Sequence, residues 1–401
     1  MALIAILLSC QGIPSTPGRD AAQDSAPADL AAGQLTLRLD RSFGEEGELP
    51  LHLVLTAAER LLAVTDAAVY QLDRDGRVLR REALPETDGG SVALLTSAAW
   101  DGTGLGATVR WGHDPALQAG SYLALADEAG AFAPAGMLAL GSATSEARTA
   151  WDPAAGRHLV LVSETQGSGR ALSLHSVARG AVAPTVRALI NGLAPGTSVG
   201  GWVGPASAPA LCAVEPPGRI RLRAFPKGQA PVLVELTDAG RTAVGPCQLA
   251  TSGRTRLVAW VQQALPVTEV DAGADIGPES LSSDVPVVRL VDPSGQAGAG
   301  SLRLTAYGET ALTEAALWDG RRYLVLVRTG YRGGRLALAS LDESGALLAR
   351  DLELPLSYEP GKLLGARLAL DPAGDLWLLY ATRRPADEGV LHLARLALHL
   401  E

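Results

Sequence analysis

The stretch Trp100-Asp101-Gly102 decides the fold, because its pattern returns along the chain at a regular interval. The tryptophan recurs after 51 residues and again after a further 51. Aspartate follows this position in four units, with glycine or proline after it, which is typical of a tight turn. The equivalent positions, in chain order, are Trp100, Trp151, Trp202, Thr251, Trp318 after an insertion, and Leu370.

A second series of turns lies further along in the same units and has the pattern Asp-x-x-Gly. Aspartate accepts local backbone hydrogen bonds, and glycine supplies the positive φ that a tight hairpin needs. Each unit therefore contains two hairpins and four antiparallel strands, here named a to d. The four turns are Asp73–Gly76, Asp127–Gly130, Asp292–Gly295 and Asp342–Gly345.

Four strands repeated every ~50 residues is the spacing of a β-propeller blade. No long amphipathic helix interrupts the series, so the sequence predicts an all-β, seven-bladed β-propeller, with six or eight blades as alternatives. The predicted blades are 51–89, 90–140, 141–189, 190–239, 240–306, 307–357 and 358–400.

The last unit has only three clear strands, Leu364–Leu370, Leu376–Tyr380 and Val390–Leu400. A spare strand, Leu35–Leu39, precedes the first complete unit. An open propeller would leave strand edges exposed, so we expect this N-terminal strand to close the last blade.

The repeats differ from WD repeats, in which a Gly-His precedes the Trp-Asp pair of each unit, because no such recurring Gly-His accompanies the pairs of this chain. Their Trp-Asp-Gly turn followed by an apolar strand resembles the units of poorly characterised bacterial surface lipoproteins with a β-propeller domain. That resemblance covers most of the chain and implies a fold, but no activity.

The N-terminus points the same way. Ala2–Leu8 is too short an apolar run to span a bilayer, but it fits the core of a secretion signal. The end of this run and the two residues after it, Leu7-Leu8-Ser9-Cys10, resemble the bacterial lipobox. This resemblance implies cleavage after Ser9 and a lipid on Cys10. No Lys or Arg precedes the run, so an upstream start, a plain signal or a chance Leu-rich start remain alternatives. The predicted organisation is a signal peptide over 1–9, a Pro- and Ala-rich tether over 10–34 and the propeller over 35–401.

These features predict a bacterial cell-envelope location with a lipid in the membrane, and Gln11 after the cysteine favours the outer membrane. A net charge of −9 without any basic cluster argues against nucleic-acid binding. Cys212 and Cys247 lie on adjacent predicted blades, where an oxidising compartment would permit a disulfide; two separately buried thiols are the alternative, because sequence does not give their distance.

No motif names a reaction, a metal or a cofactor. Gly196–Gly200 matches the Gly-x-Ser-x-Gly pattern of α/β-hydrolases, but no helix pattern follows it. The six histidines lack metal-ligand spacing. The acidic insertion at 262–285 could suggest calcium, yet Ser282 stands where an EF-hand needs glutamate, so a solvated loop is favoured.

The connections between strands b and c are predicted to be longer and more varied than the other turns, and to lie together on one face. We call it the b–c face, and we expect a noncatalytic protein that binds a protein or glycan there. Two alternatives are a propeller hydrolase or lyase with polar side chains converging in the central funnel, and a structural spacer without such a site. The predicted innermost strands consist mainly of Ala, Leu and Val, which favours the noncatalytic interpretation. Six residues on these loops form the candidate rim: His113, Asp114, Tyr331, Arg332, Arg383 and Arg384.

Overall fold

The structure is a computed structural model, and it describes most of the chain from Gln34 to His399. The signal, Cys10 and nearly all of the tether lie outside the described residues. The described ranges are 34–45, 47–56, 60–83, 93–111, 120–127, 130–132, 137–142, 146–181, 183–204, 208–264, 284–305, 312–329, 334–356, 358, 363–383 and 389–399.

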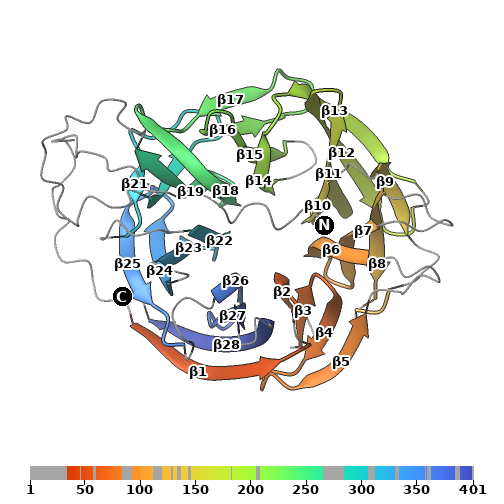
Figure 1. Ribbon diagram of the computed structural model, residues 1–401, viewed down its shortest axis with the longest axis vertical. Helices are drawn as coiled ribbons and strands as arrows, with labels where there is room; N and C mark the ends of the chain where they lie inside the picture. Colours follow the sequence, from red (N-terminus) through yellow and green to blue (C-terminus); the bar gives the residue numbers. More distant parts are fainter. Residues whose placement is uncertain are drawn as a thin grey trace, which may run out of the picture.

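Seven four-stranded antiparallel sheets form a ring of seven blades, which confirms the predicted fold class. Strand a of each blade is innermost and strand d is outermost (Figure 1). Blades 1 to 3 are β2 (Pro50–Leu55), β3 (Leu61–Thr65), β4 (Ala68–Leu72), β5 (Val78–Ala83); β6 (Ala93–Trp100), β7 (Leu105–Trp111), β8 (Gly120–Ala126), β9 (Leu138–Ser142); and β10 (Glu146–Asp152), β11 (Arg157–Gln166), β12 (Gly169–Ala178), β13 (Thr185–Leu193).

The remaining blades follow the same order. They are β14 (Ser198–Val203), β15 (Ala210–Glu215), β16 (Arg219–Ala224), β17 (Val232–Glu235); β18 (Arg241–Thr251), β19 (Arg256–Ala264), β20 (Val285–Val291), β21 (Leu302–Arg303); β22 (Leu312–Trp318), β23 (Arg322–Thr329), β24 (Arg335–Asp342), β25 (Leu347–Glu353); and β26 (Leu363–Leu370), β27 (Leu376–Arg383), β28 (Gly389–His399), completed by β1 (Gln34–Phe43).

Strand β1 closes the ring as the sequence predicts, because it pairs antiparallel with β28 from Gln34↔His399 to Phe43↔Leu391. A hydroxyl on β27, beyond β28 in the same sheet, also holds it: Tyr380 Oη donates to the Asp40 carboxylate at 2.8 and 2.9 Å. The first and last strands of the described residues thus complete one sheet.

The Asp-x-x-Gly turns have the geometry that the sequence predicts. In the turn between β24 and β25, Asp342 Oδ1 accepts hydrogen bonds from the amides of Ser344 at 2.8 Å and Ala346 at 2.9 Å. Gly345 has a φ of 92° and lies so close to Leu290 of blade 5 that a Cβ atom would be 2.5 Å from its Cδ1. Glycine is required here both for the backbone conformation and for the contact with the preceding blade.

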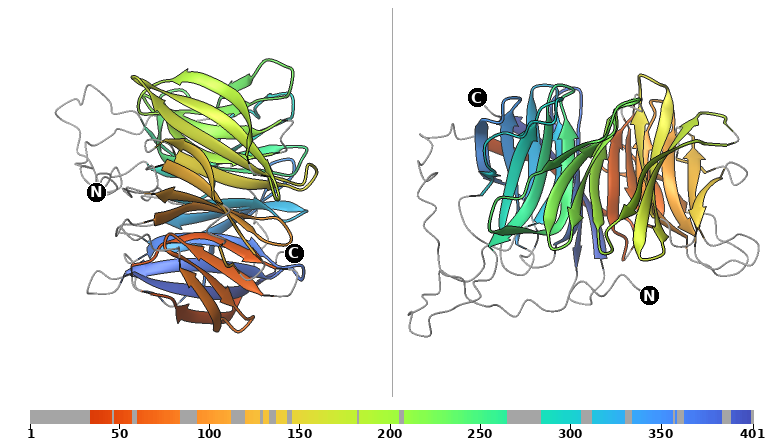
Figure 2. Two further views of the ribbon diagram at one scale, coloured as in Figure 1. Left: turned by 90° about the vertical axis from the view of Figure 1, so that its right-hand side faces the viewer. Right: turned by 90° about the horizontal axis from the view of Figure 1, so that it is seen from above.

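Apolar side chains fill all seven interfaces between successive blades, including the one between blades 7 and 1. Strands b are covered on both sides by this packing, which is why runs such as Leu159–Val162 are continuously apolar and buried. Seen edge-on, the blades form a disc whose strands run between its two faces (Figure 2). No helix able to cross a membrane occurs in the described part of the chain.

Candidate functional site

Of the six candidate rim residues, only Arg383 lies within the described ranges. It is the last residue of β27, at the b–c end of blade 7, and its side chain is exposed. The other five, and with them most of the predicted b–c loops, lie outside the described residues: His113, Asp114, Tyr331, Arg332 and Arg384.

One predicted loop is wrong. The b–c connections expected from the sequence are Gly112–Gly120, Glu164–Gly169, 262–285, Arg328–Gly334 and Arg383–Gly389. Of these, Glu164–Gly169 is not an extended loop, because β11 continues to Gln166 and β12 begins at Gly169. The two strands stay paired up to Gln166↔Gly169, because Gly167, with a φ of 57°, allows a two-residue turn. The b–c connection of blade 3 is therefore a tight hairpin turn rather than an extended loop.

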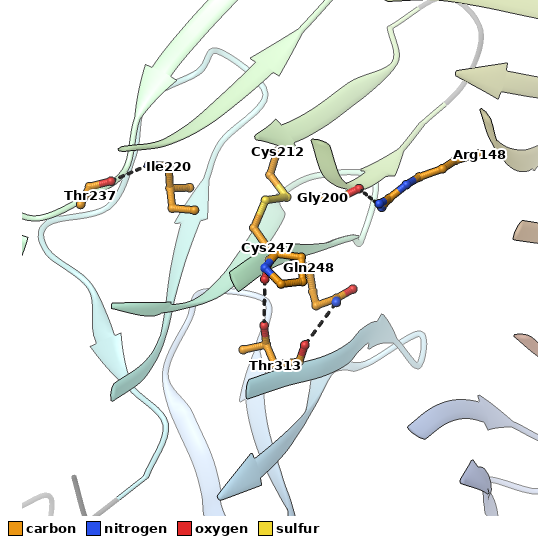
Figure 3. Close-up of a disulfide and its surroundings, with 9 residues drawn as sticks. Arg148, Gly200, Cys212, Ile220, Thr237, Cys247, Gln248 and Thr313 are labelled. Carbon is orange, nitrogen blue, oxygen red and sulfur yellow. Dashed lines mark hydrogen bonds between the residues drawn. A yellow bond between two sulfur atoms is a disulfide. The ribbon is translucent and has the colours of Figure 1, made fainter. Parts of the chain in front are cut away.

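A disulfide joins Cys212 on β15 to Cys247 on β18, with the Cα atoms 6.2 Å apart (Figure 3). It links blade 4 to blade 5, and both cysteines are fully buried in the core between these blades. Gly200 of the Gly-x-Ser-x-Gly pattern lies directly beside it, where a Cβ atom would overlap Cys247. Ser198 begins β14 and no helix follows, so in the structure this pattern serves close packing of two innermost strands.

The innermost strands bring together polar side chains that the sequence analysis missed. They occupy one position of the repeat, three residues before the residue equivalent to Trp100. In blade 1 the residue equivalent to Trp100 is Leu55, the last residue of β2. Alanine and valine stand there in two blades, Ala315 and Val199, and polar residues stand in the other five: His52, Ser97, Arg148, Gln248 and Arg367.

Four of these side chains bond to the innermost strand of the next blade. Arg148 donates to the Gly200 carbonyl (Figure 3), and Arg367 Nε donates to the Leu51 carbonyl at 3.0 Å. The other two bonds are Ser97 Oγ to the Thr149 carbonyl at 3.4 Å and Gln248 Nε2 to the Thr313 carbonyl at 3.2 Å. These bonds hold the strands together around the propeller axis.

Glu314 joins this level through a β-bulge. The register of β22 and β23 shifts between Thr313 and Ala315, so Glu314 is the additional residue, and bulges re-aim side chains in this way. Its carboxylate lies 2.8 Å from Arg328 Nε and 3.8 Å from Arg367 Nη1. A second pair, Glu146 and Arg170 at 3.0 Å, lies at the b–c end of blade 3.

We call these seven residues the axial cluster: His52, Glu146, Arg148, Arg170, Glu314, Arg328 and Arg367. They come from blades 1, 3, 6 and 7, and β10 and β26 lie on opposite sides of the ring (Figure 1). Glu146 is the first residue of β10 and Arg328 is the second last of β23, so the cluster occupies the b–c half of the axis. Solvent reaches it, since the side chain of Arg367 is 34% exposed.

The charges of the cluster interact across the ring. Burial lowers the pKa of the Arg148 guanidinium; Glu146 opposes this shift, and Arg367 and Arg170 add to it. Burial also lowers the pKa of Arg367, against the effect of Glu314. Burial, together with the charge of Arg367, lowers the pKa of His52 to about 4, so this imidazole is neutral at pH 7.

The opposite face offers less chemistry. A shallow pocket of about 420 Å³ lies there at the ends of β2, β22 and β26, with Trp318 and Leu370 in its wall. The adjacent aspartates serve the turns: Asp319 Oδ1 accepts from the amides of Arg321 and Arg322, each at 2.7 Å, and Asp371 Oδ1 accepts from Asp375 N at 2.9 Å. The described residues contain no group of three His, Cys, Asp or Glu side chains that could hold a metal ion.

The described histidines away from the axis have structural partners. His158 is fully buried, with Nε2 3.3 Å from Asp101 Oδ2 of the preceding blade, and its ring lies 4.8 Å from that of Trp151. His175 contacts Ser173 Oγ at 3.0 Å, and His392 contacts Thr382 Oγ1 at 2.9 Å. These contacts agree with the interpretation of ordinary strand histidines.

Comparisons with known proteins identify the fold alone. No protein-family model matches the chain, and no curated protein does. A chain of a mitotic checkpoint complex is similar at a TM-score of 0.54 and 15% identity, covering 96% of this chain and 99% of that one. The extracellular region of plexin A4 is similar at 0.52 and 10%, covering 87% of this chain and 50% of that one.

Prolyl oligopeptidase B from Galerina marginata also aligns, at a TM-score of 0.47 and 8% identity over 84% of this chain. This chain spans 47% of that protein's length. The two neighbours with a TM-score above 0.5 support the fold, and at such identities none of the three carries information on activity.

Proposed function

We propose that this chain is a lipid-anchored protein of the bacterial cell envelope whose propeller is a noncatalytic binding module. A protein or glycan partner is received on the b–c face, at the axis. The observation that carries the proposal is the difference between the two faces: ionisable side chains from four blades gather in the b–c half of the axis, whereas the described aspartates of the opposite face are used in turns. Exposed convergent polar groups are typical of recognition sites.

Two further features support the proposal. The buried disulfide between Cys212 and Cys247 is typical of an oxidising compartment such as the bacterial periplasm. A spacer without a binding role would need no charged groups at the axis, where they cost desolvation energy. Lipid attachment through Cys10 rests on the lipobox resemblance.

A second candidate, a hydrolase or lyase acting at the axis, gains one supporting observation. Such an enzyme requires acidic, His or Arg side chains converging from several innermost strands, and the axial cluster contains all three types. In the described residues, however, Glu314 is held by Arg328, and no hydrogen bond joins a serine, threonine or cysteine to His52. Binding therefore accounts for the cluster more simply than nucleophilic catalysis.

Site-specific photo-cross-linking in the native cell envelope tests the binding face. A photoreactive amino acid replaces Arg383 on the b–c face or, as the control, Arg254, whose side chain is 86% exposed in the a–b turn of blade 5. We expect a discrete cross-linked product from position 383 and none from position 254. Equal products from both positions, or none from 383, would contradict the proposal.

Fatty-acid labelling tests the anchor separately. We expect the wild-type chain to incorporate a clickable fatty acid and to sediment with membranes, and Cys10→Ala to lose both properties. A wild-type chain without label would overturn the lipid anchor but leave the cross-linking result intact.

A further inference from the structure

The axial cluster carries an excess of positive charge. It contains four guanidinium groups and two carboxylates, and His52 adds no charge at pH 7 because its pKa is about 4. The whole chain is acidic, with a net charge of −9, so this local excess runs against its overall balance. Partly buried cations without an equal number of anions are costly unless a counter-charge is bound.

The two arginines on innermost strands are oriented by carbonyl groups rather than neutralised by carboxylates. Arg148 donates to the Gly200 carbonyl, and within the described residues no carboxylate lies within 4.0 Å of it. Arg367 donates to the carbonyls of Leu51 at 3.0 Å and Ala366 at 2.7 Å, and its only carboxylate neighbour among those residues, Glu314, is 3.8 Å away.

These contacts leave donors available. A guanidinium group has five N–H donors, of which Arg148 uses one and Arg367 two in these bonds. The carbonyl contacts fix the position of each group, as preorganised binding requires. Burial is the main cause of the lowered pKa of Arg148, and the charge of Arg367 lowers it further, so the two groups repel one another and a bound anion would relieve this repulsion.

We propose that Arg148 and Arg367 bind an oxyanion at the propeller axis, a carboxylate or phosphate group of the ligand that enters from the b–c face. This inference rests on the proposed binding role of that face and adds the chemical class of the ligand. Arginine pairs with both groups through parallel N–H donors. Arg170 and Arg328, already paired with Glu146 and Glu314, contribute positive potential around the site.

Thermal unfolding of the purified full chain tests the inference, with sodium phosphate and sodium succinate as separate probes and sodium chloride at matched ionic strength as the reference. We expect Tm to rise with the logarithm of the concentration of at least one oxyanion. A rise with phosphate alone assigns a phosphate ligand, and a rise with succinate alone assigns a carboxylate ligand.

The variants separate binding from general salt effects. Arg148→Gln and Arg367→Gln should each weaken the apparent affinity at least ~10-fold, since each loses one charged hydrogen-bonding partner of the anion. The matched control is Arg219→Gln, which removes a 43% exposed arginine paired with Glu235 on blade 4 and should keep the full response. General salt stabilisation would affect all variants equally.

Equal Tm shifts in wild type and both axial variants, or no shift with either oxyanion, would overturn the inference. Should Arg148→Gln fail to fold, Arg367→Gln on another blade carries the comparison. If the anion response is absent but cross-linking from position 383 is retained, the oxyanion ligand is refuted and the proposed binding face still stands. If the anion response is present but no cross-linked product forms, the oxyanion site is supported and the proposed protein or glycan partner is refuted.

Discussion

The disulfide between blades 4 and 5 gives the sharpest test of the structure. Cys212 and Cys247 are 35 residues apart, and both lie in the buried interface between the two blades. In the chain-entropy relation, opening a loop of this length costs about 4 kcal/mol of unfolding free energy at 25 °C. With an unfolding entropy of roughly 2.1 cal/mol/K per residue, this corresponds to a fall in Tm of about 5 °C for a domain of this size.

The assay is urea and thermal unfolding of the oxidised chain, the reduced chain and the double variant Cys212→Ala/Cys247→Ala. The first two differ only in the cross-link, so their difference isolates it. The double variant should be at least as unstable as the reduced chain, since it also loses two buried sulfur atoms, and reductant should not affect it. A reduced chain within 1 kcal/mol of the oxidised chain, or a double variant that responds to reductant, would refute the reasoning.

Three further substitutions test the turns, the ring closure and the axis. Gly345→Ala should lower the unfolding free energy in urea by about 2 to 3 kcal/mol, because it adds a clash with Leu290 to backbone strain. The control Gly320→Ala, with a φ of 96° and no atom within 4 Å, should cost only about 1 kcal/mol, and equal losses would argue against the contact with Leu290. Asp40→Ala should lower the unfolding free energy by about 1.5 to 3 kcal/mol, because it removes the acceptor of the Tyr380 hydroxyl. Tyr380→Phe should then cost much less in the Asp40→Ala background than in wild type, and additive losses in this double-mutant cycle would count against the hydrogen bond. The wild-type chain should lose stability as the pH falls from 6.5 towards 4, because His52 has a lower pKa when folded than when unfolded. In unfolding series at stepped pH, His52→Gln should remove that part of the loss, and an unchanged pH profile would contradict the lowered pKa of His52.

The fold could be predicted because its signals are local. A turn such as Asp342–Gly345 carries its own aspartate and glycine, and these residues bond and bend as expected whatever the rest of the chain does. The closing strand could also be predicted, since a missing strand at one end and a spare strand at the other leave a single arrangement that satisfies both.

The axial cluster could not be predicted in the same way, because its residues are close only after the ring has formed. Arg367 is the single charged residue of β26, Arg148 is one of several polar residues of β10, and Glu314 joins the cluster through a bulge that strand alternation does not show. Aligning the units on Trp100 and comparing the residue three positions earlier would have revealed His52, Arg148 and Arg367 as one set. The predicted rim consisted of residues on connecting loops, and of its six residues only Arg383, at the end of β27, lies within the described ranges.

The pairing of β1 with β28 also sets the order in which the molecule can form. Gln34 and His399 are among the first and last described residues, yet they are direct partners in one sheet. On a chain that emerges from its N-terminal end, β1 has no partner until almost the entire sequence is available, and such long-range pairing slows folding. Until then its edge is open to other strands. The seventh blade therefore cannot be completed before β28 has been synthesised, and until then β1 is a site at which a chaperone could protect the chain.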